Sequence, residues 1–400
     1  MDRPLAGVRV LDLTRYLSGP YATLQLAEMG AEVIKVEMPV TGDDTRHIAP
    51  LKGGVSYYHS SVNRSKASVE LDLKSPANLK TLRAMIADAD VMVENFRAGV
   101  SDRLGLGHEA VAQINPRLVY CAITGFDSKG PQSRRAAFDL IVQGESGVMS
   151  LNGDPARDPE KIGIPVADIS AGMFAVQGIL AALLRRGRTG KGGLVEVNML
   201  SSLLSLSGYN PGLYFLTGKS PSRVGSRHHT VVPYGPYPTA DGLILLSTFS
   251  DGSWKKIVDA LDRPDLAGDA RFDTAPGRAA NREACESLIV EMLSAHPSQE
   301  VVRRLEAAGV PCGIVRSLGE AIDMERDSGT GSIADIDYGG EAGVIPGVRI
   351  PVKFDGEWCP VAAAPALGQD NGILERYRDK PEEERPQASD RAEKEPFSSK

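Results

Sequence analysis

In the first 200 residues, short aliphatic runs alternate with stretches whose apolar positions recur at a helical spacing. Helical patterns lie at residues 20–29, with Gly30 as a C-terminal stop, and at 76–87 and 108–114. The aliphatic runs predict buried strands at residues 8–13, 32–37, 68–71, 91–94 and 118–123. Strands that alternate with helices favour a parallel sheet covered by helices on both faces. The pattern therefore predicts an α/β fold.

The segment 163–200, GIPVADISAGMFAVQGILAALLRRGRTGKGGLVEVNML, carries the clearest candidate chemistry. It predicts a long apolar helix that begins near Asp168, then a basic glycine-rich turn and a short strand at 194–197. The positive end of a helix dipole favours an ionised carboxylate, so we expect Asp168 to be an anion. An ionised Asp in a dry cleft can attack an activated acyl group. Asp is also an ordinary helix N-cap, and the local pattern leaves both interpretations open.

The second half of the chain has a different character. Residues 222–235 are polar and loop-like, and a second compact unit is predicted from 237 to about 322. That unit should open with a strand pair around the turn at 241–242. Its predicted helices lie at 254–261, 282–294 and 298–308. Prolines after residue 350 indicate an extended segment. Residues 379–400 are rich in Glu, Lys, Arg, Pro and Ser, and we expect them to be disordered.

Composition narrows the function classes. The chain has 400 residues, of which 42% are hydrophobic and 24% charged, as in a globular protein of two domains or one large one. Its net charge of −7 argues against nucleic acid as a partner. The longest apolar run, within 173–184, contains Gln177 and is too short to span a bilayer, so we expect no membrane partner. No Gly-x-Gly-x-x-Gly follows the first strand, which argues against a dinucleotide cofactor.

The cysteines and histidines predict neither a disulfide framework nor a metal site. The four cysteines, Cys121, Cys285, Cys312 and Cys359, are far apart and form no Cys-x-x-Cys pair. This usage suits a reducing compartment, and no N-terminal signal is visible, so we expect a cytoplasmic protein. His228 and His229 are adjacent and should point in different directions, so a loop role is favoured over metal binding.

The stretch PVADISAGMFAVQGILAAL resembles the segment around the nucleophilic aspartate of the family III CoA-transferases. This family includes formyl-CoA transferase and carnitine CoA-transferase. Further segments resemble the family in the same order, at residues 5–46, 64–76, 90–107, 118–131, 136–150, 231–242, 272–284 and 307–322. The similarity covers about residues 4–376. In its light we predict that Asp168 is the nucleophile.

The resemblance implies a two-domain layout and an oligomeric state. The large domain of the family is a Rossmann-like parallel-sheet α/β domain built from both chain ends. A smaller α+β domain lies in the middle of the chain, and two subunits interlock as a homodimer. On this chain, the layout predicts a large domain at 1–221, a small domain at 222–330, a return to the large domain at 331–378 and the tail at 379–400.

The resemblance also implies a covalent mechanism. The aspartate attacks the thioester of a donor acyl-CoA, which gives a mixed anhydride and CoA thiolate. The thiolate then forms an aspartyl-CoA thioester, and an acceptor carboxylate takes the CoA through a second anhydride. Coenzyme A acts as a cosubstrate, and neither a tightly bound cofactor nor a metal is implied. Asp139 matches an acidic family position near the nucleophile. It could orient a substrate or cap a helix, and Gln143 shares its helix face at i+4 with the same ambiguity.

Family positions that bind CoA match Leu17, Ser18, Leu71, Lys74, Asn95, Phe96, Arg97 and Arg103. Lys74 and Arg103 are the expected phosphate partners, and the alternative for both is solvated surface charge. Two positions depart from formyl-CoA transferase. Met38 replaces an arginine, and Ala136 replaces a lysine. The nearby arginines that could substitute are Arg46, Arg134 and Arg135.

Three function classes remain in view. CoA transfer between acids is favoured, and the stretch at 231–242 looks most like members that use succinate, mesaconate, citramalate or glutarate. The same fold hosts α-methylacyl-CoA racemases, whose proton-carrying histidine corresponds to Phe138 here. A non-enzymatic acyl-CoA-binding protein is the third class, and Asp168 argues against it.

Overall fold

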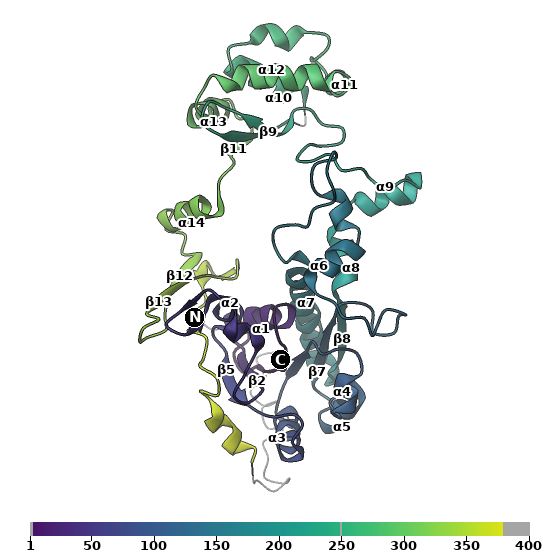
Figure 1. Cartoon of the computed structure of the whole chain (residues 1–400), viewed down its shortest axis with the longest axis vertical. Coiled ribbons are helices and arrows are strands. Elements are labelled where there is room, and N and C mark those ends of the chain that lie inside the picture. The colour runs from purple at the N-terminus through teal and green to yellow at the C-terminus, as the bar shows by residue number, and fades with distance from the viewer. Residues whose placement is uncertain (1–2, 249, 379–400) are drawn as a thin grey trace. The chain divides into compact units, whose positions relative to one another are not determined.

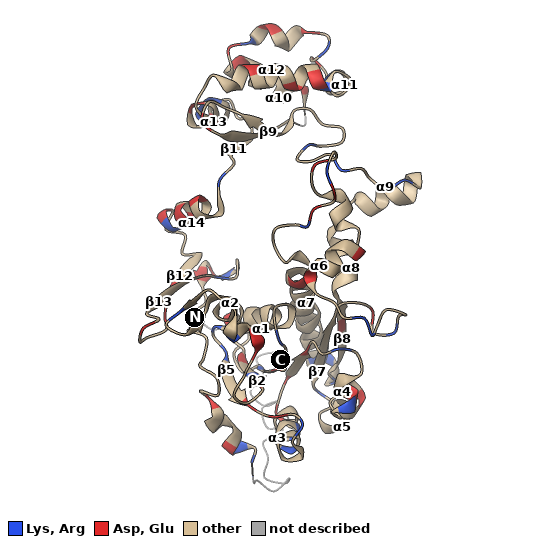
Figure 2. Ribbon diagram, in the orientation of Figure 1, with Lys and Arg blue, Asp and Glu red and all other residues tan. Residues whose placement is uncertain are grey.

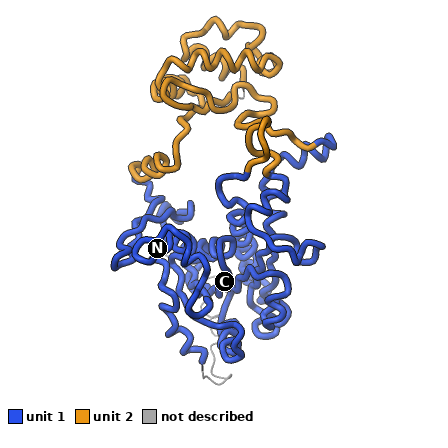
Figure 3. Tube along the Cα trace, viewed as in Figure 1, with its two compact units in different colours: residues 1–148, 161–219, 329–400 blue, residues 149–160, 220–328 orange. Residues whose placement is uncertain are grey.

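A computed structural model describes residues 3–248 and 250–378. Within them the chain forms two compact units, shown in Figure 3. Unit 1 contains residues up to 148, 161–219 and those from 329 onward, and unit 2 contains residues 149–160 and 220–328. The sequence analysis assigned 149–160 to the large domain, whereas this segment clusters with unit 2. The predicted tail at 379–400 lies outside the described residues.

Unit 1 is built on a six-stranded sheet in which every neighbouring pair is parallel (Figure 1). In spatial order the strands are β5 (Ala67–Glu70), β2 (Glu32–Glu37), β1 (Arg9–Asp12), β6 (Val91–Glu94), β7 (Val119–Thr124) and β8 (Gly193–Asn198). Strands β1 and β6 are buried along their whole length, which explains why they read as continuous aliphatic runs. The predicted α/β fold is confirmed.

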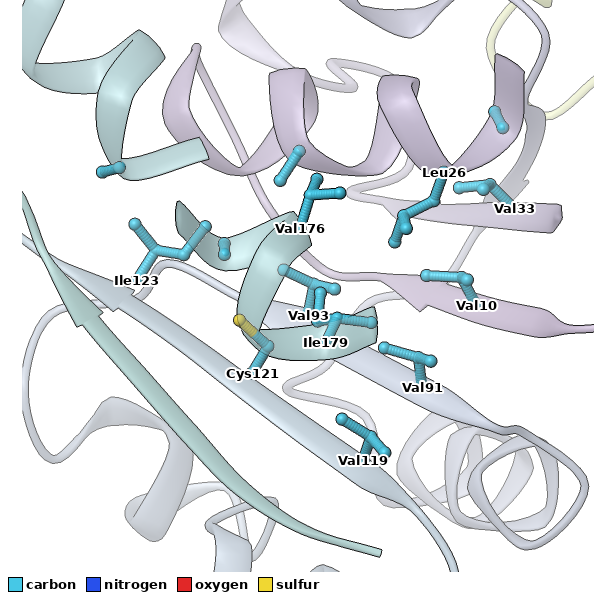
Figure 4. Close-up of a cluster of buried hydrophobic side chains, with 14 of the residues drawn as sticks. Val10, Leu26, Val33, Val91, Val93, Val119, Cys121, Ile123, Val176 and Ile179 are labelled. Atoms are coloured by element: carbon cyan, nitrogen blue, oxygen red, sulfur yellow. The ribbon is translucent and has the colours of Figure 1, made fainter. Parts of the chain in front are cut away.

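Helices cover both faces of this sheet and build two apolar cores. Helices α1 (Ser18–Glu28), α7 (Val166–Thr189) and α8 (Met199–Leu206) cover one face, and α3 (Pro76–Ala87) and α5 (His108–Ile114) cover the other. Successive strand residues point to opposite faces, so Val10 joins the first core and Leu11 the second. Figure 4 shows the first core, where Val93 and Cys121 lie against Val176 and Ile179 of α7.

Shorter elements complete unit 1. They are the helices η1 (Asp44–His47), α2 (Tyr57–Asn63), α4 (Val100–Arg103), α6 (Asp139–Glu145) and α9 (Asn210–Thr217), with η2 (Val148–Leu151) at the border of the units. Hairpins pair β3 (Leu51–Lys52) with β4 (Val55–Ser56), β12 (Ile333–Asp337) with β13 (Val344–Val348), and β14 (Lys353–Phe354) with β15 (Glu357–Trp358). The sequence predicted the region of the β14–β15 hairpin only as an extended segment, and it predicted no strand pair at the β12–β13 hairpin.

The C-terminal part of the described chain packs into unit 1. Leu374, in η4 (Asn371–Arg376), and Tyr377 are buried in the second core. The Tyr377 hydroxyl donates to Oδ2 of Asp88 at 2.7 Å and accepts from Nη1 of Arg9 at 2.9 Å. Both ends of the described chain therefore contribute to the large unit, as expected.

Unit 2 contains a three-stranded antiparallel sheet in the order β11 (Cys312–Ile314), β10 (Leu243–Ser247), β9 (Tyr234–Pro238). Its helices are α10 (Asp251–Ala260), η3 (Pro264–Gly268), α11 (Ala275–Ala280), α12 (Arg282–Ser294), α13 (Ser298–Ala307) and α14 (Leu318–Asp327). Trp254, Phe272 and Ile289 are buried in its core. Arg278 is buried beside them, and its guanidinium donates to the carbonyls of Val232 at 2.9 Å and Phe272 at 2.8 Å.

Helix α7 requires a correction. The sequence analysis judged its apolar run too short to cross a bilayer, but the helix has 24 residues and is long and apolar enough by length and composition alone. Its Ala171, Ala175 and Ile179 are fully buried in the first core of unit 1. The core helix of a globular protein passes the same test, and these contacts explain the apolar composition.

A close approach between α1 and α7 predicts a stability effect. A Cβ added at Gly172 would lie 2.8 Å from the backbone oxygen of Ser18 and 3.0 Å from Cδ1 of Tyr21. Gly172→Ala should therefore force the helices apart and destabilise the protein by roughly 1–3 kcal/mol, although Ala has the better helix propensity. The midpoint of thermal unfolding should fall. Gly319→Ala in α14, where the nearest atom is 4.0 Å away, is the control and should not lower it. A Gly172→Ala midpoint equal to wild type would contradict the packing.

Candidate functional site

The order of the strands creates a crevice at the carboxyl ends of the central strands β1 and β6. The chain runs from β1 outward to β2 and β5, and then returns to β6 on the other side of β1. Loops that leave β1 and β6 diverge at such a reversal, and α/β proteins bind ligands there, at the carboxyl ends of the strands. A cavity of about 520 Å³ lies at this place, lined by residues that follow β1, β6 and β7 together with the start of α6. The volume is in the range of small-molecule and cofactor sites.

Asp168 lines this cavity from the first turn of α7. Its side chain is partly buried and lines the cavity with Ser18 of α1, whose hydroxyl and backbone N–H lower the pKa of the Asp168 carboxyl and so favour its ionised form. The first N–H groups of a helix have no partners within the helix, so they are available to an anion. The nucleophile predicted from the sequence therefore lies at the N-terminal ends of two helices.

The ionisation of Asp168 differs from the expectation. Burial, with the negative charge of Asp139 in second place, raises the pKa of the Asp168 carboxyl to about 7, although the hydrogen bonds from Ser18 lower it. The expectation that the helix dipole would keep this group readily ionised was wrong, because desolvation and a neighbouring like charge outweigh the favourable contacts. A carboxyl with this pKa is partly protonated near neutral pH.

Asp139 caps α7, the helix that carries Asp168, rather than its own helix α6. It occupies the first position of α6, and its Oδ1 accepts from the backbone N–H of Ala167 at 2.8 Å. Its Oδ2 accepts from Nε2 of Gln143 at 2.6 Å. Pro165, the N-cap residue of α7, provides no side-chain cap of its own. The first N–H groups of a helix have no acceptor within it, and Asp139 thus supplies an acceptor for one of those of α7.

Gln143 holds the segment that leads into α7. It is fully buried, its Oε1 accepts from the N–H of Ile162 at 2.8 Å, and its Nε2 also reaches the carbonyl of Ile164 at 3.3 Å. Asp139 and Gln143 together fix the backbone immediately before Asp168. These contacts show both residues holding the start of α7, the helix that carries Asp168, and a role of Asp139 toward substrate stays a prediction.

The structure brings together most, but not all, of the predicted CoA-binding residues. Five of them line the cavity with Asp168, namely Leu17, Ser18, Asn95, Phe96 and Arg97. Leu71, Lys74 and Arg103 do not line it. The Leu71 side chain is packed in the second core of unit 1, whereas Lys74 and Arg103 are exposed. The roles of all eight residues remain predictions.

Other cavity residues were missing from the predicted set. Arg15 and Arg135 line the cavity with Arg97, in a lining whose acidic residue is Asp168. Arg15 also pairs with Asp44, which lies outside this lining. Arg135, named as a substitute for the lysine absent at 136, pairs with Glu145 at 2.7 Å. The adjacent arginines Arg134 and Arg135 indicated in the sequence that Arg135 could contact CoA. No local pattern indicated that Arg15 would line the cavity.

An aromatic pair borders the same cavity. The rings of Tyr16 and Phe138 meet edge to face, with centroids 6.0 Å apart. Phe138 stands at the position of the racemase histidine and carries no exchangeable proton. Among residues 3–248 and 250–378, no three His, Cys, Asp or Glu side chains form a group that could hold a metal. His228, in unit 2, accepts at Nδ1 from the N–H of Val231 at 3.1 Å, a contact within its own loop.

Comparison with known proteins identifies the family. The model of CoA-transferase family III matches residues 5–371. The chain is 37% identical to the succinate–glutarate CoA-transferase of Agrobacterium fabrum, over 87% of this chain and 89% of that protein. It is 36% identical to the acetyl-CoA:oxalate CoA-transferase of Acetobacter aceti, with 95% and 97% covered, and to the succinyl-CoA:mesaconate CoA-transferase of Haloarcula marismortui, with 88% and 90% covered.

Solved structures agree. The crystal structure of a CAIB/BAIF family protein from Brucella suis superimposes with a TM-score of 0.85 at 34% identity, and the match covers 94% of this chain and 99% of that one. A Mycobacterium tuberculosis protein superimposes with a TM-score of 0.83 at 29% identity, over 93% and 99%. With the family model spanning nearly all of the described chain, this protein belongs to CoA-transferase family III.

Proposed function

We propose that the protein transfers CoA from an acyl-CoA to a carboxylic acid through covalent intermediates on Asp168. The observation that carries this proposal is the carboxylate of Asp168, held at the switch-point cavity against the N-terminus of α1. An Oδ of Asp168 attacks the thioester carbonyl carbon, the C–S bond breaks, and a mixed anhydride and CoA thiolate form. The thiolate attacks the Asp168 carbonyl carbon and expels the donor acid, which leaves an aspartyl-CoA thioester.

The second half of the cycle reverses these steps with a new acid. The acceptor carboxylate attacks the aspartyl thioester and releases CoA thiolate, and a second anhydride forms. The thiolate then attacks the acceptor's acyl carbon, so that the acceptor leaves as its CoA thioester and Asp168 is regenerated as a carboxylate. Each step exchanges one activated acyl bond for another, so the balance requires neither water nor ATP.

Ser18 is the proposed donor to the oxyanions. Its backbone N–H hydrogen-bonds Asp168 at the start of α1. When the Asp168 carbonyl becomes tetrahedral, the negative oxygen remains beside this N–H, in a site where a fixed donor needs little reorganisation. For CoA itself, Arg15, Arg97 and Arg135 border the cavity and suit the phosphates. Lys74 and Arg103 stay as predicted, more distant partners.

The substrate class is proposed from the relatives. Proteins named for transfer between succinate and glutarate, from succinyl-CoA to mesaconate, and from succinyl-CoA to D-citramalate are 37%, 36% and 32% identical to this chain. We propose that a C4–C5 dicarboxylate is the acceptor. A relative that uses acetyl-CoA and oxalate is 36% identical, so a panel of donors and acceptors should include both.

A homodimer is the proposed assembly. Helices α8 and α9 contain no charged residue, and Figure 2 draws them in tan. On α9, Phe215 is 80% exposed and Leu216 87% exposed, and Tyr209 and Leu206 nearby are also exposed. Exposed apolar surface of this kind marks an interaction site, and a second copy of the chain is the partner we propose.

The four cysteines are free thiols, which supports a reducing compartment such as the cytoplasm.

Covalent trapping tests the nucleophile. After incubation with succinyl-CoA, hydroxylamine should modify Asp168 because an anhydride or thioester has formed there, and mass spectrometry of the digested protein should locate the hydroxamate. Asp168→Ala should lose transfer completely and give no adduct, while it still binds CoA. Asp127→Ala, on the exposed loop after β7, is the matched control and should be trapped like wild type. Transfer by Asp168→Ala within tenfold of the wild-type rate would refute the role.

The pH profile tests the electrostatics of the site. Because the attacking species is the carboxylate, kcat/KM should rise with pH until the pKa of Asp168, about 7, and then level off. Asp139→Asn removes the negative charge that helps to raise this pKa and keeps an oxygen for the Ala167 N–H. The rising limb should therefore move to lower pH. Glu109→Gln, exposed on α5, makes the same charge change and should leave the limb in place. An unmoved limb in Asp139→Asn would show that another group controls the profile.

Dilution tests the assembly. If two copies interlock, neither can leave without local unfolding, so sedimentation velocity should detect a dimer even at nanomolar concentration. The double variant Phe215→Glu and Leu216→Glu should weaken assembly because it buries charge in the contact, whereas Leu318→Glu, at a residue 79% exposed on α14, should not. A folded monomer that appears reversibly on dilution of the wild-type protein would exclude the interlocked form.

A further inference from the structure

The side-chain amide of Asn95 hydrogen-bonds the backbone of the loop after β1 through both its oxygen and its nitrogen. Asn95 follows β6, its Oδ1 accepts from the N–H of Arg15 at 2.9 Å, and its Nδ2 donates to the carbonyl of Arg15 at 2.8 Å. The last backbone contact of the β1–β6 ladder runs from the N–H of Leu13 to the carbonyl of Val93 at 2.9 Å. Beyond the ends of β1 and β6, the Asn95 side chain thus makes the kind of paired hydrogen bonds that backbone groups make within the sheet.

The residue after this clamp has a strained backbone. Tyr16 has a φ of +65°, in the left-handed region that a bulky aromatic residue rarely adopts. Such a conformation persists only where its surroundings enforce it. On one side Asn95 fixes Arg15, and on the other the N–H of Tyr16 lies 3.4 Å from Oδ1 of Asp43 and its hydroxyl hydrogen-bonds Asp44.

The strained turn determines where α1 begins. Leu17, directly after Tyr16, is the N-cap residue of α1, and Ser18 is its first helical residue. Ser18 and Asp168 line the same cavity, and the hydroxyl and backbone N–H of Ser18 favour the ionised form of the Asp168 carboxyl. If Tyr16 relaxed to an ordinary φ, the direction of the chain at Leu17 would change, and the Ser18 N–H would move from the nucleophile. The contact of Ser18 with Asp168 therefore depends on the hydrogen bonds between Asn95, on the loop after β6, and Arg15, on the loop after β1.

We propose that Asn95 is a positioning residue that holds Tyr16 in its left-handed conformation and thereby keeps the Ser18 N–H on Asp168. This inference rests on the proposed function for its kinetic consequence. It differs from the role that the family resemblance gives Asn95, which is contact with CoA, because the amide holds the Arg15 backbone from both its oxygen and its nitrogen. Loss of the clamp should affect the chemical steps rather than CoA affinity.

A split between turnover and affinity distinguishes the two roles. In Asn95→Ala, kcat should fall on the order of a hundredfold, the scale expected when a catalytic group is misplaced by about 1 Å. The Kd of CoA, measured by calorimetry, should change less than about threefold. Asn95→Asp keeps the acceptor for the Arg15 N–H but loses the donor, and its kcat should lie between those of wild type and Asn95→Ala. Arg97→Ala, in the same loop, should weaken CoA binding instead. A raised Kd with unchanged kcat in Asn95→Ala would overturn the proposal.

A double-mutant cycle tests whether the effect acts through Tyr16. Asn tolerates the left-handed region, so the kcat loss caused by Asn95→Ala should be at least fivefold smaller in a Tyr16→Asn background than in wild type. Equal losses in the two backgrounds would overturn the proposed path. Hydrogen exchange adds a readout that needs no activity, because the Arg15 amide should exchange faster in Asn95→Ala. If the wild-type protein transfers no CoA, the proposed function fails, while faster exchange would still establish the clamp.

Discussion

The contact between the N-terminus of α1 and the carboxylate of Asp168 is the interaction on which the rest of the site depends. Gly172, one turn after Asp168, allows the two helices to approach so closely that a single methyl group there would meet the Ser18 carbonyl oxygen at 2.8 Å. The parallel sheet holds α1 and α7 on the same face through a shared apolar core. The reversal of strand order next to β1 then opens the space that Asp168 faces. The packing of α1 on α7 and the strand order thus both act on one pair of residues, Ser18 and Asp168, in one cavity.

The electrostatic arrangement serves two opposed requirements. A nucleophile for a thioester must be ionised, yet the anhydride that it forms survives only where water is scarce. Burial excludes water at the cost of a raised pKa, and the hydrogen bonds of Ser18 recover part of the carboxylate's stability. Asp139 contributes to both sides, since it caps α7 through the Ala167 N–H and adds a like charge that raises the pKa. A pKa of about 7 leaves part of the Asp168 carboxyl ionised near neutral pH, while the burial that raises the pKa also keeps water from an anhydride.

Much of the fold could be predicted because its signals are local. Strands such as β6 are buried on both faces and read as unbroken aliphatic runs, and the long apolar pattern after Asp168 predicted helix α7. The hydrogen bonds that build the site could not be predicted in this way. Asp139 reaches Ala167 across 28 residues, and Asn95 reaches Arg15 across 80, so both contacts exist only after the sheet has formed. Leu71 matched a CoA-binding position in the sequence. The match gave no information on where its side chain packs, which is in the second core of unit 1.

The central claim is that Asp168 becomes covalently bonded to both acids in turn, and isotope transfer tests it most directly. When an acceptor acid labelled with oxygen-18 in its carboxylates attacks the aspartyl thioester, one of its oxygens bridges the second anhydride. That oxygen remains on Asp168 when CoA removes the acyl group. The peptide that contains Asp168 should therefore gain one heavy oxygen after a single turnover with succinyl-CoA and the labelled acceptor, and a second one as turnovers accumulate. Full transfer of CoA without any label on Asp168 would contradict the account.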